Sequence, residues 1–361
     1  MSRLVKVVLF VLLGLVIMGA LAVLAVFPLQ REIEDTPRPS IIGVQEWANS
    51  EPVALEDLHG RVVLLDFWTY TCVNCLRTLP YLQAWDDTYR DAGLTIIGIH
   101  TPEFDFEKDL GNVKQAVKDL GVDWPVALDN SRLTWTSFQV NAWPTKVLID
   151  ADGVVRYRNS GEGHYRETEE EIRNLLQKAG MSVPAAFSTA PGAPNFDAYR
   201  GITREVYAGK AWEAFSFPPY LGNPGGHSVS AKDFKDPGER KDGSFYLHGL
   251  WRSEDEDVVH ARATEGYTDY LALPFNAGEA NAVLRPMTDQ PFRLRVTLDG
   301  KPVPEGSRGA DIQMDAQTGD THVEVNTSRL YWLYKGARDK HELRLWPTTD
   351  TFAVHSFTFG P

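Results

Sequence analysis

The chain has 361 residues, of which 43% are hydrophobic and 24% are charged, and its formal net charge is −13. This length predicts about two domains of roughly 100–200 residues each. The acidic balance argues against nucleic acid as a partner, because phosphate binding needs clustered Lys and Arg. The chain has two cysteines, Cys72 and Cys75. If this pair is redox-active, no structural disulfide remains.

Residues 1–29 predict a membrane anchor. Val7 to Phe27 is an apolar run without charge, and at about 1.5 Å per residue it reaches roughly 31 Å, enough to cross a hydrocarbon core of about 30 Å. Arg3 and Lys6 precede the run. The positive-inside rule then leaves the N-terminus in the cytoplasm and places the rest of the chain outside it, in a periplasm or at the cell surface. A signal peptide cleaved near Ala22 stays open as the alternative, and it would export the same domains.

Residues 30–40 predict a short linker, and strand and helix patterns alternate from 41 to 180. The sequence of the Asp152-Gly153 turn predicts a hairpin near the end of this region. Such alternation predicts an α/β domain with a mixed sheet. The predicted strands are 61–68, 94–100, 124–128, 146–150 and 154–158, and the predicted helices are 75–90, 106–120 and 168–179, the last capped by Thr168.

Residues 181–197, rich in Ala, Pro and Ser, predict a second linker, and the pattern changes after it. Short alternating runs then dominate, and few helical stretches compete with them. Residues 198–361 therefore predict an antiparallel β-sandwich. The clearest strands are 292–298, 321–325, 341–346 and 351–359.

The sharpest motif is Cys72-Val73-Asn74-Cys75, which stands where a buried strand meets a helix. Unpaired N–H groups and the helix dipole stabilise a thiolate on the first cysteine, and the second lies one turn later. Cys72 is thus the candidate nucleophile and Cys75 the resolving thiol. A structural zinc site would need two more ligands, which no further Cys and no paired His near the motif supply. We predict no metal and no cofactor beyond the Cys72–Cys75 disulfide.

Three further residues fit a redox site. Asp66 lies inside the apolar strand, where burial would raise its pKa and make it a candidate proton acceptor for Cys75, unless the backbone satisfies it. Pro80 should kink the helix or end it. Pro144 precedes an apolar strand. A cis peptide there would bring its loop beside Cys72 and expose backbone groups to an extended substrate, whereas an ordinary trans proline would not.

These residues resemble a known family. The strand–Trp–CxxC–helix unit, Asp66, Pro80 and Pro144 fall where thioredoxin-fold proteins keep a buried acid, a kink proline and a cis-proline. Residues 106–128 resemble the insertion of the TlpA/ResA-like branch. More narrowly, TYTCVNC, GIHTPEF followed by FEKD, and the DN, TW and WP pairs of residues 129–144 are similar to the extracytoplasmic part of DipZ-type cytochrome c biogenesis proteins. RLYWLYKG and FTFG resemble the C-terminal sandwich of those proteins, with a galactose-binding or jelly-roll-like fold.

The resemblance implies a thiol–disulfide oxidoreductase that exchanges disulfides with exported proteins, in the reductase direction, with cytochrome c maturation as one setting. It implies a docking surface formed by Trp68, Trp143, Pro144 and Thr145, although core packing is an equal alternative for the tryptophans. It also implies that Glu103 lies near the cysteines and tunes them, with a plain surface acid as the alternative.

Two departures from the family matter. DipZ-type proteins carry a multi-helix CcdA/DsbD-like module that moves electrons across the membrane, whereas this chain predicts a single anchor. A separate membrane thiol transporter of that type should therefore recharge a reductase of this kind. In addition, Thr71 replaces the Trp that often precedes the first cysteine, which leaves the pKa of the thiol open.

Two other functions remain open. A thiol peroxidase is suggested by Thr69-x-x-Cys72, although Leu65 stands where that pattern expects proline. A scaffold that binds glycan or cell-wall polymer through the sandwich is the second. Its stacking residues would be Trp251, Tyr267, Tyr270 and Trp332, although such residues are more often part of a core. The acidic run 254–257 lacks the spacing of a calcium loop and predicts a solvated loop.

Overall fold

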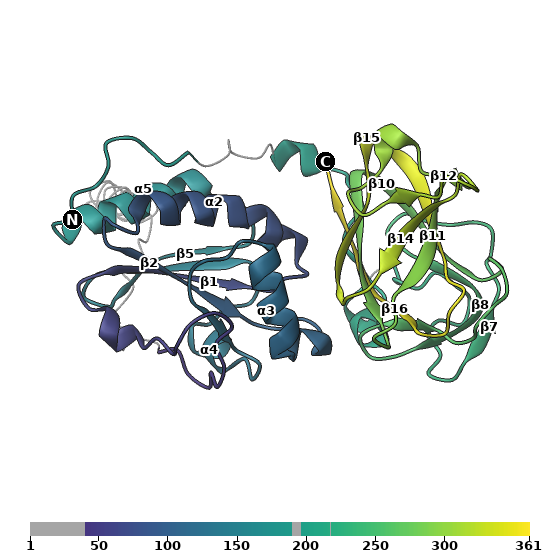
Figure 1. Cartoon of the computed structure of the whole chain (residues 1–361), viewed down its shortest axis with the longest axis horizontal. Coiled ribbons are helices and arrows are strands. Elements are labelled where there is room, and N and C mark those ends of the chain that lie inside the picture. Colours follow the sequence, from purple (N-terminus) through teal and green to yellow (C-terminus); the bar gives the residue numbers. More distant parts are fainter. Residues whose placement is uncertain (1–39, 190–195, 217) are drawn as a thin grey trace, which may run out of the picture. The chain divides into compact units, whose positions relative to one another are not determined.

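The computed structural model of the chain describes residues 40–189, 196–216 and 218–361, and Pro39–Pro361 form one compact unit (Figure 1). The predicted anchor 1–29, nearly all of the linker 30–40 and residues 190–195 of the second linker lie outside the described residues. Across the described ranges, no helix has both the length and the apolar character needed to span a membrane.

The first part of the chain forms a five-stranded mixed sheet with the order β3-β2-β1-β4-β5. The central strand β1 pairs parallel with β2 and antiparallel with β4, as the alternating pattern predicted. The strands are β1 (Val62–Trp68), β2 (Leu94–His100), β3 (Val126–Leu128), β4 (Thr145–Ile149) and β5 (Val155–Ser160). The helices are α2 (Val73–Tyr89), α3 (Leu110–Asp119), α4 (Leu133–Ser137) and α5 (Tyr165–Lys178), with the 3₁₀ helices η1 (Leu55–Leu58) and η2 (Asp105–Lys108).

Both faces of this sheet are covered, because every side chain of β1 is buried. Alternate residues of a strand point to opposite faces. Val62 and Leu64 pack with apolar residues of α2, α3 and α5 on one face, whereas Val63 and Leu65 pack with Phe138 and the segment 41–58 on the other. Figure 1 shows α2 and α5 side by side over the sheet and α4 on the opposite side. The sheet therefore supports β1 and its carboxyl end from both sides.

Several element boundaries differ from the prediction. The predicted helix 106–120 is broken into η2 and α3, because Asp109 caps α3 by accepting a hydrogen bond from the Asn112 N–H at 2.9 Å. The last helix begins at Tyr165, so Thr168 is no cap. Its hydroxyl instead donates to the carbonyl of His164 at 2.7 Å within the first turn. The short helix α4 was not predicted, and α2 runs through Pro80 rather than ending there.

The rest of the chain is all-β. Its paired strands form an 11-stranded sheet with the main order β13-β14-β11-β15-β10-β16-β9-β8-β7. The strands are β6 (Val206–Tyr207), β7 (Lys232–Phe234), β8 (Tyr246–Ser253), β9 (Val258–His260), β10 (Tyr270–Pro286), β11 (Phe292–Leu298), β12 (Lys301–Pro302), β13 (Gln313–Met314), β14 (Thr321–Val325), β15 (Arg329–Trp346) and β16 (Phe352–Gly360), with the 3₁₀ helices η3 (Phe196–Tyr199), η4 (Lys210–Phe215) and η5 (Glu305–Ser307).

Two long strands, β10 and β15, hold the all-β part together. The first residues of β10 pair with β8, whereas its second half pairs with β16, and β15 follows it along both halves. The register between β10 and β15 shifts at Ala277/Glu279, where a bulge bends the strands. The sequence predicted β11 and β14 with their observed bounds, but it found only the last six residues of β15 and missed β10.

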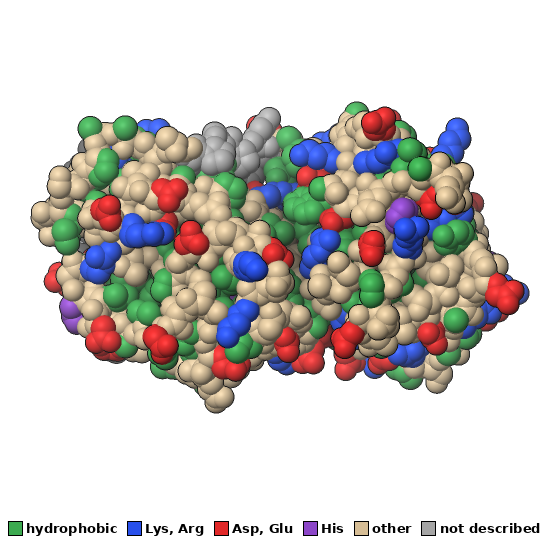
Figure 2. All heavy atoms as spheres, viewed as in Figure 1, with side chains coloured by type: hydrophobic (Ala, Val, Ile, Leu, Met, Phe, Trp, Pro, Cys, Tyr) green, Lys and Arg blue, Asp and Glu red, His purple; other side chains and the backbone are tan. Residues whose placement is uncertain are grey.

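Charges of both signs are interspersed on the face of the molecule drawn in Figure 2, where basic and acidic side chains lie close to one another. Such a surface fits the acidic net charge of the chain, −13. A face of this kind lacks the single-sign electrostatic field that steers polyanions to a protein.

Candidate active site

The two cysteines lie where the central strand β1 gives way to helix α2. Cys72 is the N-cap of α2, and its sulfur accepts a hydrogen bond from the Cys75 N–H at 3.3 Å. Both cysteines are free thiols. Cys72 is half-buried and Cys75 is buried. One thiol is thus reachable from solvent, and the other lies one helical turn behind it, as the motif predicted.

Asp66 belongs to β1, the strand that leads to this pair, and its side chain is 2% exposed. Its Oδ1 has no hydrogen-bond partner among the described residues. Burial raises the pKa of Asp66 from 3.8 to about 7, while the nearby charge of Lys146 opposes the shift. A carboxyl with this pKa exchanges its proton near neutral pH, and it also interacts electrostatically with the Cys75 sulfur.

Lys146 is a member of the site that the sequence did not predict. It faces Asp66 directly in the antiparallel register of β1 and β4, and it is fully buried. Its ammonium donates to the carbonyl of Gly161 at 3.3 Å and lies 5.3 Å from the centroid of the Tyr165 ring. Burial lowers the pKa of Lys146, and the charge of Asp66 raises it again. The two residues form a buried acid–base pair behind Cys75.

The acidity of Cys72 differs from the sequence-based expectation of a stabilised thiolate. The hydrogen bonds with Cys75 lower the pKa of the Cys72 thiol, as a helix N-terminus should. Burial raises this pKa by more, and the acidic side chains of Glu103 and Glu205 raise it further, so the net direction is upward. Because the Cys72 side chain is half-buried, water moderates this shift. The pKa of Cys75 is raised well above its ordinary value, chiefly by burial.

Glu107 joins the cysteine loop to the segment that contains Glu103. It is buried and accepts hydrogen bonds from the Thr71 hydroxyl at 2.5 Å and from the N–H groups of Glu103 and Phe104 at 2.6 and 3.0 Å. Burial raises the pKa of Glu107, and these hydrogen bonds limit the rise. Thr71, where related proteins often have Trp, is therefore an anchor for the loop. The FEKD sequence that contains Glu107 was noticed, but its role was not predicted.

His100 ends β2 next to the cysteine loop. Its Nε2 lies 3.2 Å from the Thr69 hydroxyl, and its ring stacks on Tyr70 at a centroid distance of 5.6 Å. Burial lowers the pKa of His100 to about 3, so the imidazole is neutral at physiological pH. A neutral, fixed ring of this kind shapes the loop and contributes no charge to the thiols.

The Trp143–Pro144 peptide bond is cis, as the resemblance implied. The Trp143 indole N–H donates to the carbonyl of Thr101 at 3.0 Å, which ties this loop to the segment before Glu103. Thr145 is buried and donates to the carbonyl of Ala142 at 2.7 Å, so its side chain holds the loop instead of facing a substrate. Of the predicted docking residues, Trp143 is half-buried and therefore accessible.

Trp68 was assigned to the docking surface, and this assignment is wrong. Its side chain is 1% exposed and packs in the core formed by β1, α2, α3 and α5. Gly98 on the neighbouring strand leaves room for it, since a Cβ at that position would lie 2.9 Å from the indole nitrogen. The alternative of core packing thus holds for Trp68.

The described residues contain no cluster of three or more His, Cys, Asp or Glu side chains with the arrangement of a metal site. The acidic run 254–257 is only partly solvated. Asp257 is buried and accepts a hydrogen bond from Arg285 at 3.1 Å, and Glu256 accepts one from the N–H of Asp105 at 2.8 Å.

The aromatic residues considered for glycan binding differ in their exposure to solvent. Trp251 is 0% exposed and belongs to the core, so the alternative of core packing holds for it. Trp332 packs beside an apolar cluster around Val283 and Leu330. Tyr267 is 42% exposed, and Tyr270 is half-buried. Tyr270 stacks on His248 at a centroid distance of 4.9 Å.

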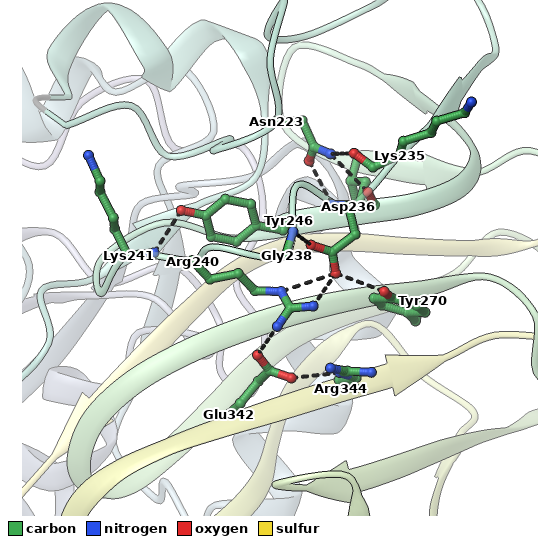
Figure 3. A network of polar contacts seen from close by, with 11 residues as sticks. Asn223, Lys235, Asp236, Gly238, Arg240, Lys241, Tyr246, Tyr270, Glu342 and Arg344 are labelled. Atoms are coloured by element: carbon green, nitrogen blue, oxygen red, sulfur yellow. Dashed lines mark hydrogen bonds and ion pairs between the residues drawn. The ribbon is translucent and has the colours of Figure 1, made fainter.

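Tyr270 is fixed by the polar network drawn in Figure 3. Its hydroxyl donates to Asp236 at 2.7 Å, and Asp236 also binds the guanidinium of Arg240. Arg240 continues to Glu342 at 2.6 Å, and Glu342 accepts from Arg344 at 2.6 Å. These hydrogen bonds lower the pKa of Asp236. The network stabilises the sheet and holds the Tyr270 ring in place.

A reachable thiol at a helix start, a resolving thiol one turn later, a buried acid behind them and a cis-proline loop define a thioredoxin-like thiol–disulfide oxidoreductase. Residues 39–176 match the family model described as Redoxin, and residues 203–360 match the one described as Thioredoxin like C-terminal domain. These two matches cover the α/β part and the all-β part separately.

The chain belongs to the thioredoxin-like family that includes ResA and is related to DipZ. It is 32% identical to the thiol-disulfide oxidoreductase ResA of Bacillus thuringiensis over 126 residues, which cover 35% of this chain and 68% of that protein. It is 34% identical to protein DipZ of Mycobacterium bovis over 287 residues, or 78% of this chain. The matched region spans only 39% of the length of DipZ.

A solved structure of a putative thiol:disulfide interchange protein DsbE from Chlorobium tepidum is also similar. Its TM-score is 0.34 at 23% identity, and the match covers 38% of this chain and 94% of that one.

Proposed function

We propose that this protein is a disulfide reductase that acts on exported proteins. The observation that carries the proposal is the Cys72 sulfur at the start of α2, bound by the Cys75 N–H at 3.3 Å, with a buried carboxyl of pKa about 7 behind the second thiol. This arrangement supplies a nucleophile, a resolving thiol and a proton acceptor.

The proposed cycle begins with the reduced pair. The Cys72 thiolate attacks one sulfur of a substrate disulfide, a Cys72–substrate bond forms, and the other substrate sulfur leaves and takes up a proton. Cys75 then gives its proton to Asp66 and attacks the Cys72 sulfur. The second substrate sulfur leaves as a thiolate and is protonated. Two electrons have passed from Cys72 and Cys75 to the substrate, and the Cys72–Cys75 disulfide remains.

Serine variants of the two cysteines test the assignment. Cys72→Ser should lose at least about a thousandfold in insulin reduction, because the attacking sulfur is gone. Cys75→Ser should instead accumulate a mixed disulfide with the substrate, because release needs the second thiol. A Cys72→Ser protein with full exchange activity would exclude the proposed function.

The reductase direction rests on the raised pKa of Cys72. A thiolate that is poorly stabilised makes the reduced form less favourable and the pair more reducing. Equilibration with glutathione should give a potential near that of thioredoxin, about −270 mV, and a value near about −120 mV would indicate an oxidase.

We further propose that residues 1–29 anchor the protein and leave residues 41–361 outside the cytoplasm. The apolar run from Val7 to Phe27 supports this. Electrons would come from a separate membrane thiol transporter of the CcdA/DsbD type, and apocytochrome c is a candidate substrate. Protease treatment of intact spheroplasts should digest residues 41–361, and full protection would contradict the proposed topology.

The thiol peroxidase alternative is weaker, since a peroxide-reducing cysteine depends on a stabilised thiolate and the pKa of Cys72 is raised. Peroxide consumption by the reduced protein is the direct test.

Glycan binding by the all-β part, which we propose to be a jelly-roll-like sandwich, retains one favourable observation. Tyr270 lies 4.7 Å from Trp346, and the Arg295 guanidinium lies 4.8 Å from the Tyr267 ring, so aromatic rings and arginines lie together. Co-sedimentation with cell-wall material tests this surface. If the Tyr267→Ala variant co-sediments as the parent protein does, this surface is not the binding site.

A further inference from the structure

The strand β6 brings a residue of the all-β part to the thiol site. The Tyr207 hydroxyl donates a hydrogen bond to Glu103 Oε1 at 2.6 Å. The two residues are 104 positions apart in the sequence. Tyr207 pairs with Ser356 of β16, and the next N–H, that of Ala208, donates to the carbonyl of His355 at 2.8 Å. The backbone that carries Tyr207 is therefore fixed by the large sheet.

The Tyr207 ring is also fixed by packing. It stacks on Trp212 with a centroid distance of 4.4 Å and an interplanar angle of 23°. It packs beside an apolar cluster in which Val73, the residue after Cys72, and Phe104, the residue after Glu103, meet residues of β10 and β15. The fixed ring places its hydroxyl between two acids, because the Tyr207 side chain also forms a hydrogen bond with Glu205 that lowers the pKa of that carboxyl.

Glu103 is held from two sides. Its backbone N–H donates to Glu107 at 2.6 Å, and its side chain accepts from Tyr207. The segment with Glu103 is thus fastened to the thiol loop through Glu107 and to the all-β part through Tyr207.

The groups around Glu103 and Cys72 shift the pKa values of these two residues, and some of them act in opposite directions. Burial and the acids Glu205 and Glu107 raise the pKa of Glu103 by more than the Tyr207 hydroxyl and Arg132 lower it, so the pKa lies well above its ordinary value. A hydrogen bond donated to a carboxylate favours its charged form. In its charged form Glu103 adds, together with Glu205, to the rise in the pKa of the Cys72 thiol that burial causes, while the hydrogen bonds with Cys75 lower this pKa.

We propose that Tyr207 is a positioning residue for the thiol pair: its hydroxyl favours the charged form of Glu103 and orients this carboxyl beside Cys72, so that the all-β part helps to keep the pair reducing. This inference rests on the proposed function, because it concerns the same thiols. A negative charge beside Cys72 disfavours the thiolate and hence the reduced state, which shifts electrons toward the substrate.

The test is a double-mutant cycle in the full chain. Tyr207→Phe removes only the hydroxyl, and Glu103→Gln removes the charge. Two readouts report on Cys72 without any protein substrate: the pH dependence of its alkylation by iodoacetamide, and the equilibrium of the 72–75 pair with glutathione.

Tyr207→Phe should shift the alkylation midpoint to lower pH and move the glutathione equilibrium toward the dithiol by about threefold to tenfold, as expected for a weakened, partly exposed neighbouring charge. Glu103→Gln should act in the same direction and by more. In the Glu103→Gln background, Tyr207→Phe should have a much smaller effect, because Tyr207 acts mainly through that carboxyl and retains only its hydrogen bond with Glu205.

A matched control is Tyr334→Phe, which removes a hydroxyl that donates to the carbonyl of Ala337 within the all-β part. It should leave both readouts unchanged. An unshifted Tyr207→Phe protein, or an equal shift in the Glu103→Gln background, would overturn the proposal. Neither result depends on whether Cys72→Ser abolishes insulin reduction, so failure of the proposed function is recognised separately.

Discussion

Burial has opposite consequences for the pKa values of two aspartates, one in the α/β part and one in the all-β part. Asp66 in the α/β part has an oxygen without a hydrogen-bond partner among the described residues, and its pKa is raised to about 7. Asp269 in the all-β part, with a side chain 1% exposed, accepts hydrogen bonds from Arg262, His260, Thr268 and the N–H of Leu250. Its pKa is held well below the usual range.

The difference is one of donors, since both carboxyl groups are removed from water. Desolvation favours the neutral acid unless hydrogen bonds and positive charge compensate for it. Asp269 has that compensation and stays charged, which suits a structural role. Asp66 lacks most of it, which leaves a carboxyl whose proton can move near neutral pH. The poorly satisfied acid is therefore the one to associate with chemistry.

The largest expected effect is a difference in the rate of substrate release between variants of the two aspartates. Asp66→Asn should slow the release of substrate from a preformed Cys72 mixed disulfide about a hundredfold at pH 7, the usual contribution of a general base. Stopped-flow release of a chromogenic thiol measures this step. Asp269→Asn is the matched control, and its release rate should stay within about twofold of the parent because it lies outside the thiol site. Equal release rates in the two variants would contradict the assignment of Asp66 as the proton acceptor.

The second effect is a difference in the free energy of unfolding between variants of the same two aspartates. Asp269→Asn should lower the free energy of unfolding at pH 7 by about 2–3 kcal/mol, because Arg262 and His260 lose a buried anionic partner while Arg262 stays partly solvated. Urea unfolding followed by tryptophan fluorescence measures this. Asp66→Asn should be no less stable than the parent at the same pH. A larger loss for Asp66→Asn would contradict the assignment of roles.

The third effect is a pH dependence. Folded Asp66 keeps its proton up to about pH 7, whereas the unfolded chain loses it near pH 4, so the folded state binds more protons between these values. Stability should therefore fall as pH rises through this window. Over this window the parent should lose about 4 kcal/mol of stability that Asp66→Asn does not lose, since each unit of the shift from 3.8 to about 7 corresponds to about 1.4 kcal/mol. Identical pH profiles for the two proteins would show that the pKa of Asp66 is ordinary.

The smallest effect concerns Lys146, whose positive charge lowers the pKa of Asp66. Lys146→Met should move the midpoint of the pH–rate profile for release upward by about half a pH unit, because the carboxyl loses the positive charge that lowers its pKa. Lys178→Met, at the end of α5, is a control that should leave the midpoint in place. A downward shift for Lys146→Met would mean that Asp66 is not the group that titrates.

Local sequence identified much of the α/β part. The apolar strands 61–68 and 94–100 match β1 and β2 within one residue, and the CxxC motif lies at the strand–helix junction where it was predicted. These features depend on residues near one another in the chain, and hydrophobic periodicity reports them well. The β10 strand was missed because bulges interrupt the alternation of its buried residues.

The sequence by itself determined which atoms are reactive: two thiols one helical turn apart, an acid inside a buried strand and a proline before another. Only the tertiary structure decided how reactive they are. The register of β1 with β4 sets Lys146 opposite Asp66, η2 carries Glu107 to Thr71, and β6 carries Tyr207 to Glu103. A pKa depends on charge, donors and water within a few ångströms in space, and such neighbours come from chain segments tens of residues apart.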